Sequence, residues 1–309
     1  MSTLIRRLAD RVRAYLAVPV REYLRDNPSP SDAASQLALM LSYRNTMAAG
    51  HPLPSLQDVG FKVFSQTDED GILLYLFSLI GAKHRTCVEI CAGDGIECNT
   101  ANLIINHGWH GLLVDGDAAR VARGTDFYRT LPNTRVFPPI FVCSWVTRGG
   151  INALLREHGF EGEIDLLSLD LDGIDYWVWE AIEAITPRVV VVEYQDMLGP
   201  ERACTVPYAD DFSCDRFPKT GGMPNFAGAS LRAFVELGRH KGYRLVGVNR
   251  YGFNAFFVRL GLGDELLPEI DVGTCFSHPK VLWGMRERVQ TTAGLPWVDV
   301  TPTSKLAKS

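Results

Sequence analysis

The sequence lacks several features that would assign its class directly. No apolar run reaches the ~18 residues that a membrane-spanning helix needs, and the arginine-rich start has no long apolar core like that of a secretory signal. The net charge of −5 gives no overall attraction to nucleic acid. Seven cysteines form no C-x-x-C pair, and several fall in expected buried strands. We therefore expect a cytoplasmic protein with reduced thiols that neither binds nucleic acid nor crosses a membrane.

The most informative part of the sequence runs from residue 86 to residue 117. Residues 87–90 are typical of a short buried strand, and Gly93 and Gly95 follow it in a tight turn. Residues 112–114 predict a second buried strand, which ends at Asp115, 20 residues after Gly95. In a nucleotide-binding βαβ unit, an acid at that position lies at the strand tip and accepts hydrogen bonds from ribose hydroxyls.

Two cofactors use this layout. A dinucleotide site needs G-x-G-x-x-G, and the third glycine is replaced here by Cys98. An S-adenosylmethionine site typically shows E-x-G-x-G-x-G, which Glu89, Gly93 and Gly95 match, with Cys91 in place of the first glycine. The turn therefore favours S-adenosylmethionine, and a dinucleotide-dependent oxidoreductase is an alternative.

The rest of the chain predicts a doubly wound α/β sheet. Further strands are expected at residues 136–142, from 164, at 188–192, and as a hairpin at 243–249 and 254–258; helices are expected at 1–26, 32–49, 72–80, 230–240 and 280–289. We expect a helical extension over 1–55, a main domain over 56–260 and a C-terminal extension over 261–309. The arginine-rich helix at 1–26 is expected to pack on the domain or on a second copy, with membrane-surface binding as an alternative.

Acidic residues follow two neighbouring strands of the predicted sheet. Asp170, Asp172 and Asp175 come after the strand that begins at 164, and Glu193 ends the next strand. Ligands bind beyond the carboxyl ends of strands in such sheets, so these acids should face the crevice. Asp170 or Glu193 would serve as a general base, or Asp170, Asp172 and Glu193 would hold Mg²⁺ or Mn²⁺; simple capping of strand ends is the alternative.

Two more segments carry hypotheses. Residues 196–228 are rich in proline and glycine and are expected to form a lid. Asp68, Glu69 and Asp70 fall at the expected start of a helix, where its dipole favours acids. The alternative is that Ser65, Gln66 and Asp68 form part of the rim of the cofactor pocket. A zinc site is disfavoured because its candidate ligands lack paired spacing; they are Cys204, Cys214, Cys275 and His278.

Four segments resemble the FkbM-like methyltransferases, a class I S-adenosylmethionine-dependent family: residues 89–95, 99–100, 108–115 and 168–176. The resemblance implies a Rossmann-like methyltransferase sheet, mostly parallel with a C-terminal antiparallel hairpin, and O-methylation of a sugar or natural-product hydroxyl, so a small-molecule or glycan acceptor. It also implies cofactor contacts from Glu89, Gly93, Gly95, Asn99 and Asp115. In such a fold, an adenine-contacting residue would sit near Ser144. A binding or assembly protein that keeps the fold without catalysis is the alternative.

Overall fold

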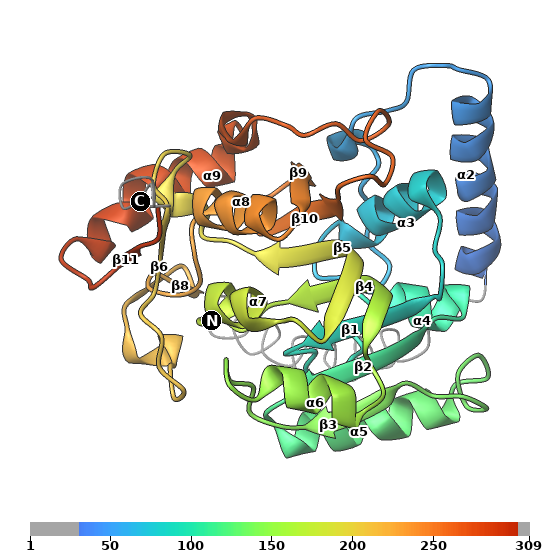
Figure 1. Ribbon diagram of the computed structural model, residues 1–309, viewed down its shortest axis with the longest axis horizontal. Helices are drawn as coiled ribbons and strands as arrows, with labels where there is room; N and C mark the ends of the chain where they lie inside the picture. Colours follow the sequence, from blue (N-terminus) through green and yellow to red (C-terminus); the bar gives the residue numbers. More distant parts are fainter. Residues whose placement is uncertain (1–30, 302–309) are drawn as a thin grey trace, which may run out of the picture.

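The structure is a computed structural model that describes residues 31–301, so the helix expected at residues 1–26 lies outside it. Its centre is a seven-stranded sheet (Figure 1). In order across the sheet, the strands are β3 (Ile140–Cys143), β2 (His110–Asp115), β1 (Thr86–Ile90), β4 (Gly162–Leu169), β5 (Ile185–Glu193), β10 (Asn254–Arg259) and β9 (Tyr243–Val248). The strand order reverses beside β1, which creates the crevice where such folds bind ligands.

Helices cover both faces of this sheet. One face packs against α6 (Ile151–Glu157), α7 (Asp175–Ala181) and α8 (Leu231–His240). The other packs against α3 (Glu69–Ile80), α4 (Ala101–His107) and α5 (Ala118–Thr130). The sheet strands are rich in valine, isoleucine and leucine because both of their faces are buried. The expected doubly wound fold is confirmed.

The last two sheet strands form the expected antiparallel hairpin. β10 lies between β5 and β9 and runs antiparallel to both, with Asn254 opposite Glu193. All other neighbouring strands of the sheet run parallel. Because Asn254 lies opposite Glu193, the start of β10 lies beside the carboxyl end of β5.

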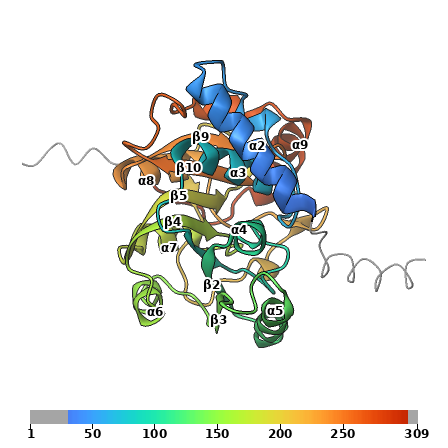
Figure 2. The ribbon, with the colours of Figure 1, turned by 90° about the vertical axis from the view of Figure 1, so that its right-hand side faces the viewer.

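An additional helix covers the outside of α3. This helix, α2 (Ser31–Ala48), lies across α3 and reaches α4 (Figure 2). Tyr43 and Tyr75 meet edge to face, with ring centroids 4.9 Å apart, and Gln36 exchanges hydrogen bonds with Asn102 on α4. The second expected helix is therefore present and packs on the main domain.

Several element boundaries differ from the expected ones. β3 begins at Ile140, because Val136 and Phe137 are exposed and two prolines follow them. α3 begins at Glu69, three residues early, and β5 runs from Ile185 to Glu193. The helix expected at 280–289 is a short α9 (Pro279–Trp283), followed by the π-helical turn η5 (Gly284–Arg288) and the 3₁₀ turn η6 (Val289–Thr292).

The segment expected to be one long lid is packed at both of its ends. Its elements are η2 (Asp196–Leu198), β6 (Cys204–Thr205), η3 (Cys214–Arg216), β7 (Lys219–Thr220) and β8 (Met223–Pro224). Val206 and Phe226 are fully buried, whereas residues 209–222 are largely exposed or half-buried. Proline and glycine counts could not reveal those buried apolar anchors. The lid therefore stays a prediction, and it is confined to residues 207–222, which lie between the buried anchors.

The residues after 260 contribute to the same core. Val272, Phe276 and Val281 join the cluster under α8, with Val272 and Phe276 in η4 (Val272–Phe276). β11 (Val298–Asp299) pairs with β6, and η1 (Leu56–Asp58) packs beside β9. The division at residues 55 and 260 stays a prediction.

Candidate active site

The turn after β1 has three residues in the left-handed region of backbone space. They are Cys91 (φ 63°), Gly93 (φ 62°) and Gly95 (φ 66°). These are the three glycine positions of the E-x-G-x-G-x-G pattern. Glycine takes this conformation without cost, whereas any residue with a Cβ is strained there by about 1–2 kcal/mol. Cys91 therefore keeps the turn but stores strain at the edge of the crevice.

The two glycines serve different purposes. A Cβ on Gly95 would lie 2.7 Å from Phe141 and 2.8 Å from Leu113, so this glycine allows the turn to pack on the sheet. A Cβ on Gly93 would meet only the Arg120 side chain, at 3.8 Å. The space above Gly93 is thus open to a ligand, which would approach the backbone there.

Asp115, the last residue of β2, is held beside this turn. Its Oδ2 accepts a hydrogen bond from the Gly93 amide at 2.8 Å, and its Oδ1 accepts one from the Asp117 amide at 2.8 Å. The side chain is buried next to the crevice. Each carboxylate oxygen has a second acceptor position, so Asp115 retains the capacity to accept two ribose hydroxyls, and its contact with a cofactor stays a prediction.

Glu89 is fully engaged by the protein. Its Oε1 accepts from the Asn99 amide (2.9 Å), and its Oε2 accepts from the Thr100 amide (2.8 Å) and hydroxyl (2.6 Å). Asn99 in turn donates from its side chain to Ser168 at 3.0 Å. This buried network fixes the start of α4 against β1 and β4. It gives Glu89 a positioning role, and direct cofactor contacts from Glu89 and Asn99 stay predictions.

Ser144 lines a cavity beside Asp115. Its amide donates to the Asp115 carbonyl at 3.0 Å. The cavity has a volume of about 60 Å³ and is closed by Trp145, Asp210 and Phe212. The Trp145 indole donates to the Asp210 carbonyl at 2.6 Å, and a Cβ on Gly173 would lie 2.5 Å from Phe212. Asp210 and Phe212 were not expected here, because no local pattern shows where a loop docks.

The carboxylates beyond β4 and β5 come together as predicted. Asp170, Asp172 and Glu193 each present an oxygen within 4.8 Å of the other two. Oxygens on opposite sides of a cation at 2.0–2.6 Å lie about 4–5 Å apart. The three side chains therefore fit a shared Mg²⁺, Mn²⁺ or Ca²⁺, and oxygen-only ligands suit these hard cations. Among the described residues, this is the one such group.

Burial raises the pKa values of all three carboxyl groups, and mutual repulsion raises those of Asp170 and Glu193 further. Burial, followed by Asp172 and Asp175, raises the pKa of Asp170. Burial, followed by Asp170, raises the pKa of Glu193 well above its usual range. Burial also raises the pKa of Asp172, which nearby Lys219 partly opposes. A proton or a cation is thus favoured between Asp170 and Glu193 at neutral pH.

The third acid after β4 does not join this group. Asp175 accepts from the Leu171 amide at 2.7 Å and the Gly173 amide at 3.1 Å. Asp172 lies in this same turn, with φ of 52°. The buried Asp175 carboxylate therefore stabilises the turn that contains Asp172. The expectation that all three acids face the crevice is wrong for Asp175, because a tight turn replaces the extended strand after Leu169.

The acids at the start of α3 accept hydrogen bonds from backbone and side-chain groups of the protein itself. Asp70 Oδ2 accepts from three consecutive amides, those of Val63, Phe64 and Ser65. Glu69 accepts from Asn249 and Asn254 at the β9–β10 hairpin. Asp68 accepts from the Arg250 amide at 3.3 Å. These contacts favour the structural interpretation of this segment over a cofactor rim.

Two other sequence-based expectations can be compared with the structure. The candidate zinc ligands Cys204, Cys214, Cys275 and His278 form no common group within residues 31–301, and all seven cysteines, each within that range, are free thiols. In the same range, every helix is too short or too polar to cross a bilayer.

The sequence matches no protein-family model and no curated protein. Similar solved structures include an S-adenosylmethionine-dependent methyltransferase from Clostridium acetobutylicum ATCC 824, at 12% identity and TM-score 0.38, over 61% of this chain and 89% of that one. An O-methyltransferase from Bacillus cereus in complex with SAH is 14% identical, with TM-score 0.40, over 77% and 95%. The magnesium protoporphyrin IX methyltransferase of Synechocystis PCC 6803 is 11% identical, with TM-score 0.34, over 81% and 96%. Likenesses this distant add nothing to what the strand order already shows.

Proposed function

We propose that this protein is an S-adenosylmethionine-dependent methyltransferase that methylates a hydroxyl group of a small-molecule or glycan acceptor. The observation that carries the proposal is the pairing of two features at one sheet edge. The left-handed turn at 91–95 faces Asp115, and the carboxylate group of Asp170, Asp172 and Glu193 lies beyond the adjacent strands β4 and β5. The proposed cofactor site and the proposed proton-accepting site would therefore be neighbours.

The cofactor would lie across the ends of β1 and β2. Asp115 would accept the ribose hydroxyls, and the open backbone at Gly93 would allow the amino acid part to approach. The base would enter beside Ser144, against Trp145, in the space that Phe212 closes in this structure. The present cavity of about 60 Å³ is far smaller than the 300–1,000 Å³ typical of ligand sites. Binding therefore requires Phe212 and the adjoining lid residues to move outward.

Methyl transfer is a direct displacement. The acceptor oxygen attacks the methyl carbon, the carbon–sulfur bond breaks, and the bonding pair leaves with sulfur. The hydroxyl proton goes to a carboxylate, for which Asp170 is the best placed because it directly follows β4, the strand between β1 and β5. Alignment of oxygen, carbon and sulfur by the closed lid would supply much of the rate.

A divalent cation would complete this site. Asp170, Asp172 and Glu193 would hold it, and when bound it would lower the pKa of the acceptor hydroxyl and orient it. Without a cation, the raised pKa values keep one proton within the group. The general base then has to be the carboxylate that remains ionised.

A second candidate function is a binding or assembly protein that keeps the fold without catalysis. The strained Cys91 and the small closed cavity favour it. Isothermal titration with S-adenosylmethionine and S-adenosylhomocysteine separates the two. We expect both to bind, with a stoichiometry of one. Absence of binding for both ligands, in protein that unfolds cooperatively, would exclude the methyltransferase and leave the second candidate.

A further inference from the structure

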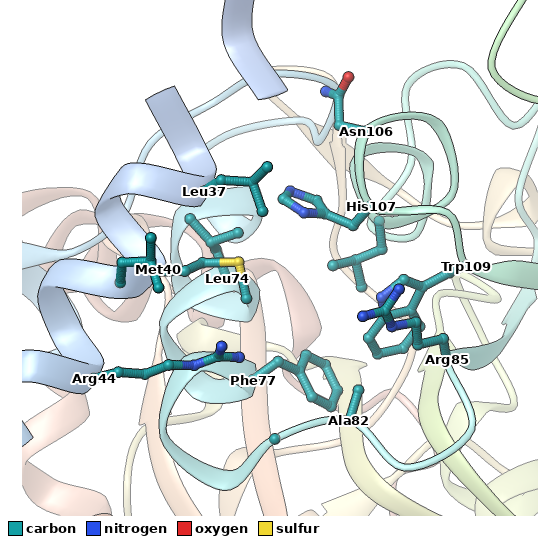
Figure 3. A pocket seen from close by; sticks show the side chains of 13 residues that line it. Leu37, Met40, Arg44, Leu74, Phe77, Ala82, Arg85, Asn106, His107 and Trp109 are labelled. Carbon is teal, nitrogen blue, oxygen red and sulfur yellow. The ribbon is translucent and has the colours of Figure 1, made fainter. Parts of the chain in front are cut away.

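A second pocket lies at the edge of the sheet opposite the one that carries the candidate active site. It is formed where α2, α3 and α4 meet, and it has a volume of about 550 Å³ (Figure 3). Arg85 and Trp109, which line it, directly precede β1 and β2. The pocket is thus at the amino ends of the strands whose carboxyl ends form the crevice. Its volume falls within the 300–1,000 Å³ typical of small-molecule sites.

The floor of this pocket is apolar. Leu74 and Phe77 come from α3, and Leu37, Met40 and Leu41 come from α2. Leu37 and Leu41 are 52% and 56% exposed, although each could bury its side chain against a ligand. Complete burial of one leucine is worth about 1.5–3 kcal/mol. An apolar ligand body would therefore gain free energy by covering this floor.

The charged lining of the pocket has only one sign. Arg44 and Arg85 approach from opposite sides (Figure 3), and no acid among residues 31–301 lines the pocket, although acids outnumber basic residues in the chain, 36 to 31. The Arg44 Nε donates to the Ser78 carbonyl at 3.4 Å. Within residues 31–301, neither guanidinium has an acidic partner. Two unneutralised guanidinium groups at the mouth of an apolar pocket attract an anion.

The ends of two helices reduce this positive charge but do not cancel it. α3 and α4 both end at the pocket, at Ile80 and His107. Each helix C-terminus carries the equivalent of about −0.5 charge. Two arginines and two helix ends therefore leave a net charge of roughly +1, since His107 is kept neutral by burial and by Arg85, which lower its pKa. That balance suits a ligand with a single negative charge.

Arg85 is also held in an unusual conformation. Its φ is 55°, in the left-handed region, which costs an arginine about 1–2 kcal/mol. Strained residues of this kind are frequent at ligand sites, where the strain fixes a side-chain direction. Here the backbone directs the guanidinium to the same pocket that Arg44 borders.

We propose that this pocket binds a carboxylate with an apolar body, the carboxylate lying between Arg44 and Arg85 and the apolar body lying on the floor formed by α2 and α3. The ligand class is an aliphatic or aromatic monocarboxylate. This site is independent of the proposed methyl transfer, because it shares no residue with the crevice.

Isothermal titration of the full chain with decanoate, below its micelle concentration, tests the proposal. We expect saturable binding with one site per chain. Acetate tests the head group alone, decanol the apolar body alone, and decyltrimethylammonium the opposite charge; each should bind at least tenfold more weakly. Decyl phosphate tests whether a dianion is accepted, and it should bind more weakly than decanoate. Equal affinity for decanoate and any of these four ligands would overturn the assignment.

Variants locate the site. Arg44→Gln with Arg85→Gln should weaken decanoate binding at least tenfold, whereas Arg129→Gln with Arg135→Gln, two exposed arginines elsewhere, should not change it. Leu41→Glu alters only an exposed side chain at the pocket and should also weaken binding several-fold. Far-ultraviolet circular dichroism confirms folding. Should the double variant fail to fold, Leu41→Glu decides, and unchanged affinity in Leu41→Glu would contradict the proposal.

Discussion

The Gly93 amide donates a 2.8 Å hydrogen bond to Asp115 Oδ2, so the turn that ends β1 is tied directly to the acid that ends β2. This bond links two parts of the cofactor pattern that are separate in sequence. It means that Asp115 has two roles: it holds the turn, and it offers its remaining acceptor positions to a ligand. Substitutions of Asp115 should therefore affect both.

Asp115→Ala should weaken S-adenosylmethionine binding at least tenfold, because two hydrogen bonds to a charged group are lost, each worth about 1.5–3 kcal/mol. Asp115→Asn keeps an acceptor for the Gly93 amide and should lose less affinity. Isothermal titration measures both. Asp117→Ala is the matched control: Asp117 caps α5 through the Ala119 amide, so its loss should lower stability by about 1 kcal/mol and leave affinity unchanged. Wild-type affinity in a folded Asp115→Ala protein would show that Asp115 does not bind the cofactor.

Phe212→Ala should spare or tighten cofactor binding and reduce methyl transfer at least tenfold. The phenyl ring packs on Gly173 and closes the cavity beside Ser144, so its removal opens the entrance but leaves the closed state less tightly sealed. A variant that lacks residues 209–222 should also keep cofactor binding, but it should lose methyl transfer completely. Loss of cofactor binding in either variant would show that this segment is structural rather than a lid.

Exhaustive treatment with EDTA should reduce activity, and Mg²⁺ or Mn²⁺ should restore it, because three converging carboxylates repel one another until a cation neutralises them. Asp170→Asn should cost more rate than Asp172→Asn, since Asp170 follows β4 directly, whereas Asp172 is exposed in the turn beyond it. Initial rates at saturating cofactor measure both effects. Full activity after chelation would exclude a catalytic metal and leave Asp170 as a general base. Full activity of the Asp170→Asn variant would exclude both roles.

Cys91→Gly should keep or slightly raise the melting temperature, because glycine removes about 1–2 kcal/mol of left-handed strain and adds a smaller entropy cost in the unfolded chain. Cys91→Val should lower it, since a β-branched side chain is least tolerated at φ 63°. Urea unfolding gives the order of stability. A valine variant as stable as wild type would show that the turn relaxes without cost.

Glu163→Gln should destabilise the protein at pH 7 by about 1 kcal/mol or less, which corresponds to roughly 2–4 °C or less in Tm. Hydrogen bonds from Lys83 and Arg259 lower the pKa of Glu163 to about 2. A lowered pKa stabilises the fold above the unfolded-state value of about 4.5, and this contribution is lost as pH falls from there towards 2. The difference in unfolding free energy between wild type and variant should therefore be constant from pH 8 to pH 5 and shrink below that.

The control for this experiment is Glu161→Gln, which removes an exposed pair with Arg156. Its effect on stability should be smaller at every pH. A difference for Glu163→Gln that grows in acid would show that the contacts with Lys83 and Arg259 are not what stabilises the fold there.

The sequence alone determined the sheet and the principal turn. Runs of valine, isoleucine and leucine identify strands buried on both faces, and a hairpin after α8 is readable from two strand-like segments joined by a short turn. The glycines at 93 and 95 identify the turn, because a left-handed backbone is a local property that glycine supplies. Asp115 and Glu193 are predictable as strand-end residues, because each directly follows an apolar run.

Only the tertiary structure decided what each polar group does. Asp172 and Asp175 look alike in sequence, but a turn directs Asp172 to the crevice and buries Asp175 as a brace. Phe212 reaches the crevice because the two ends of its segment are anchored by core contacts distant in sequence. The pocket between Arg44 and Arg85 exists because α2 packs on α3. Hydrogen bonds and packing between remote segments set these roles, and no local pattern records them.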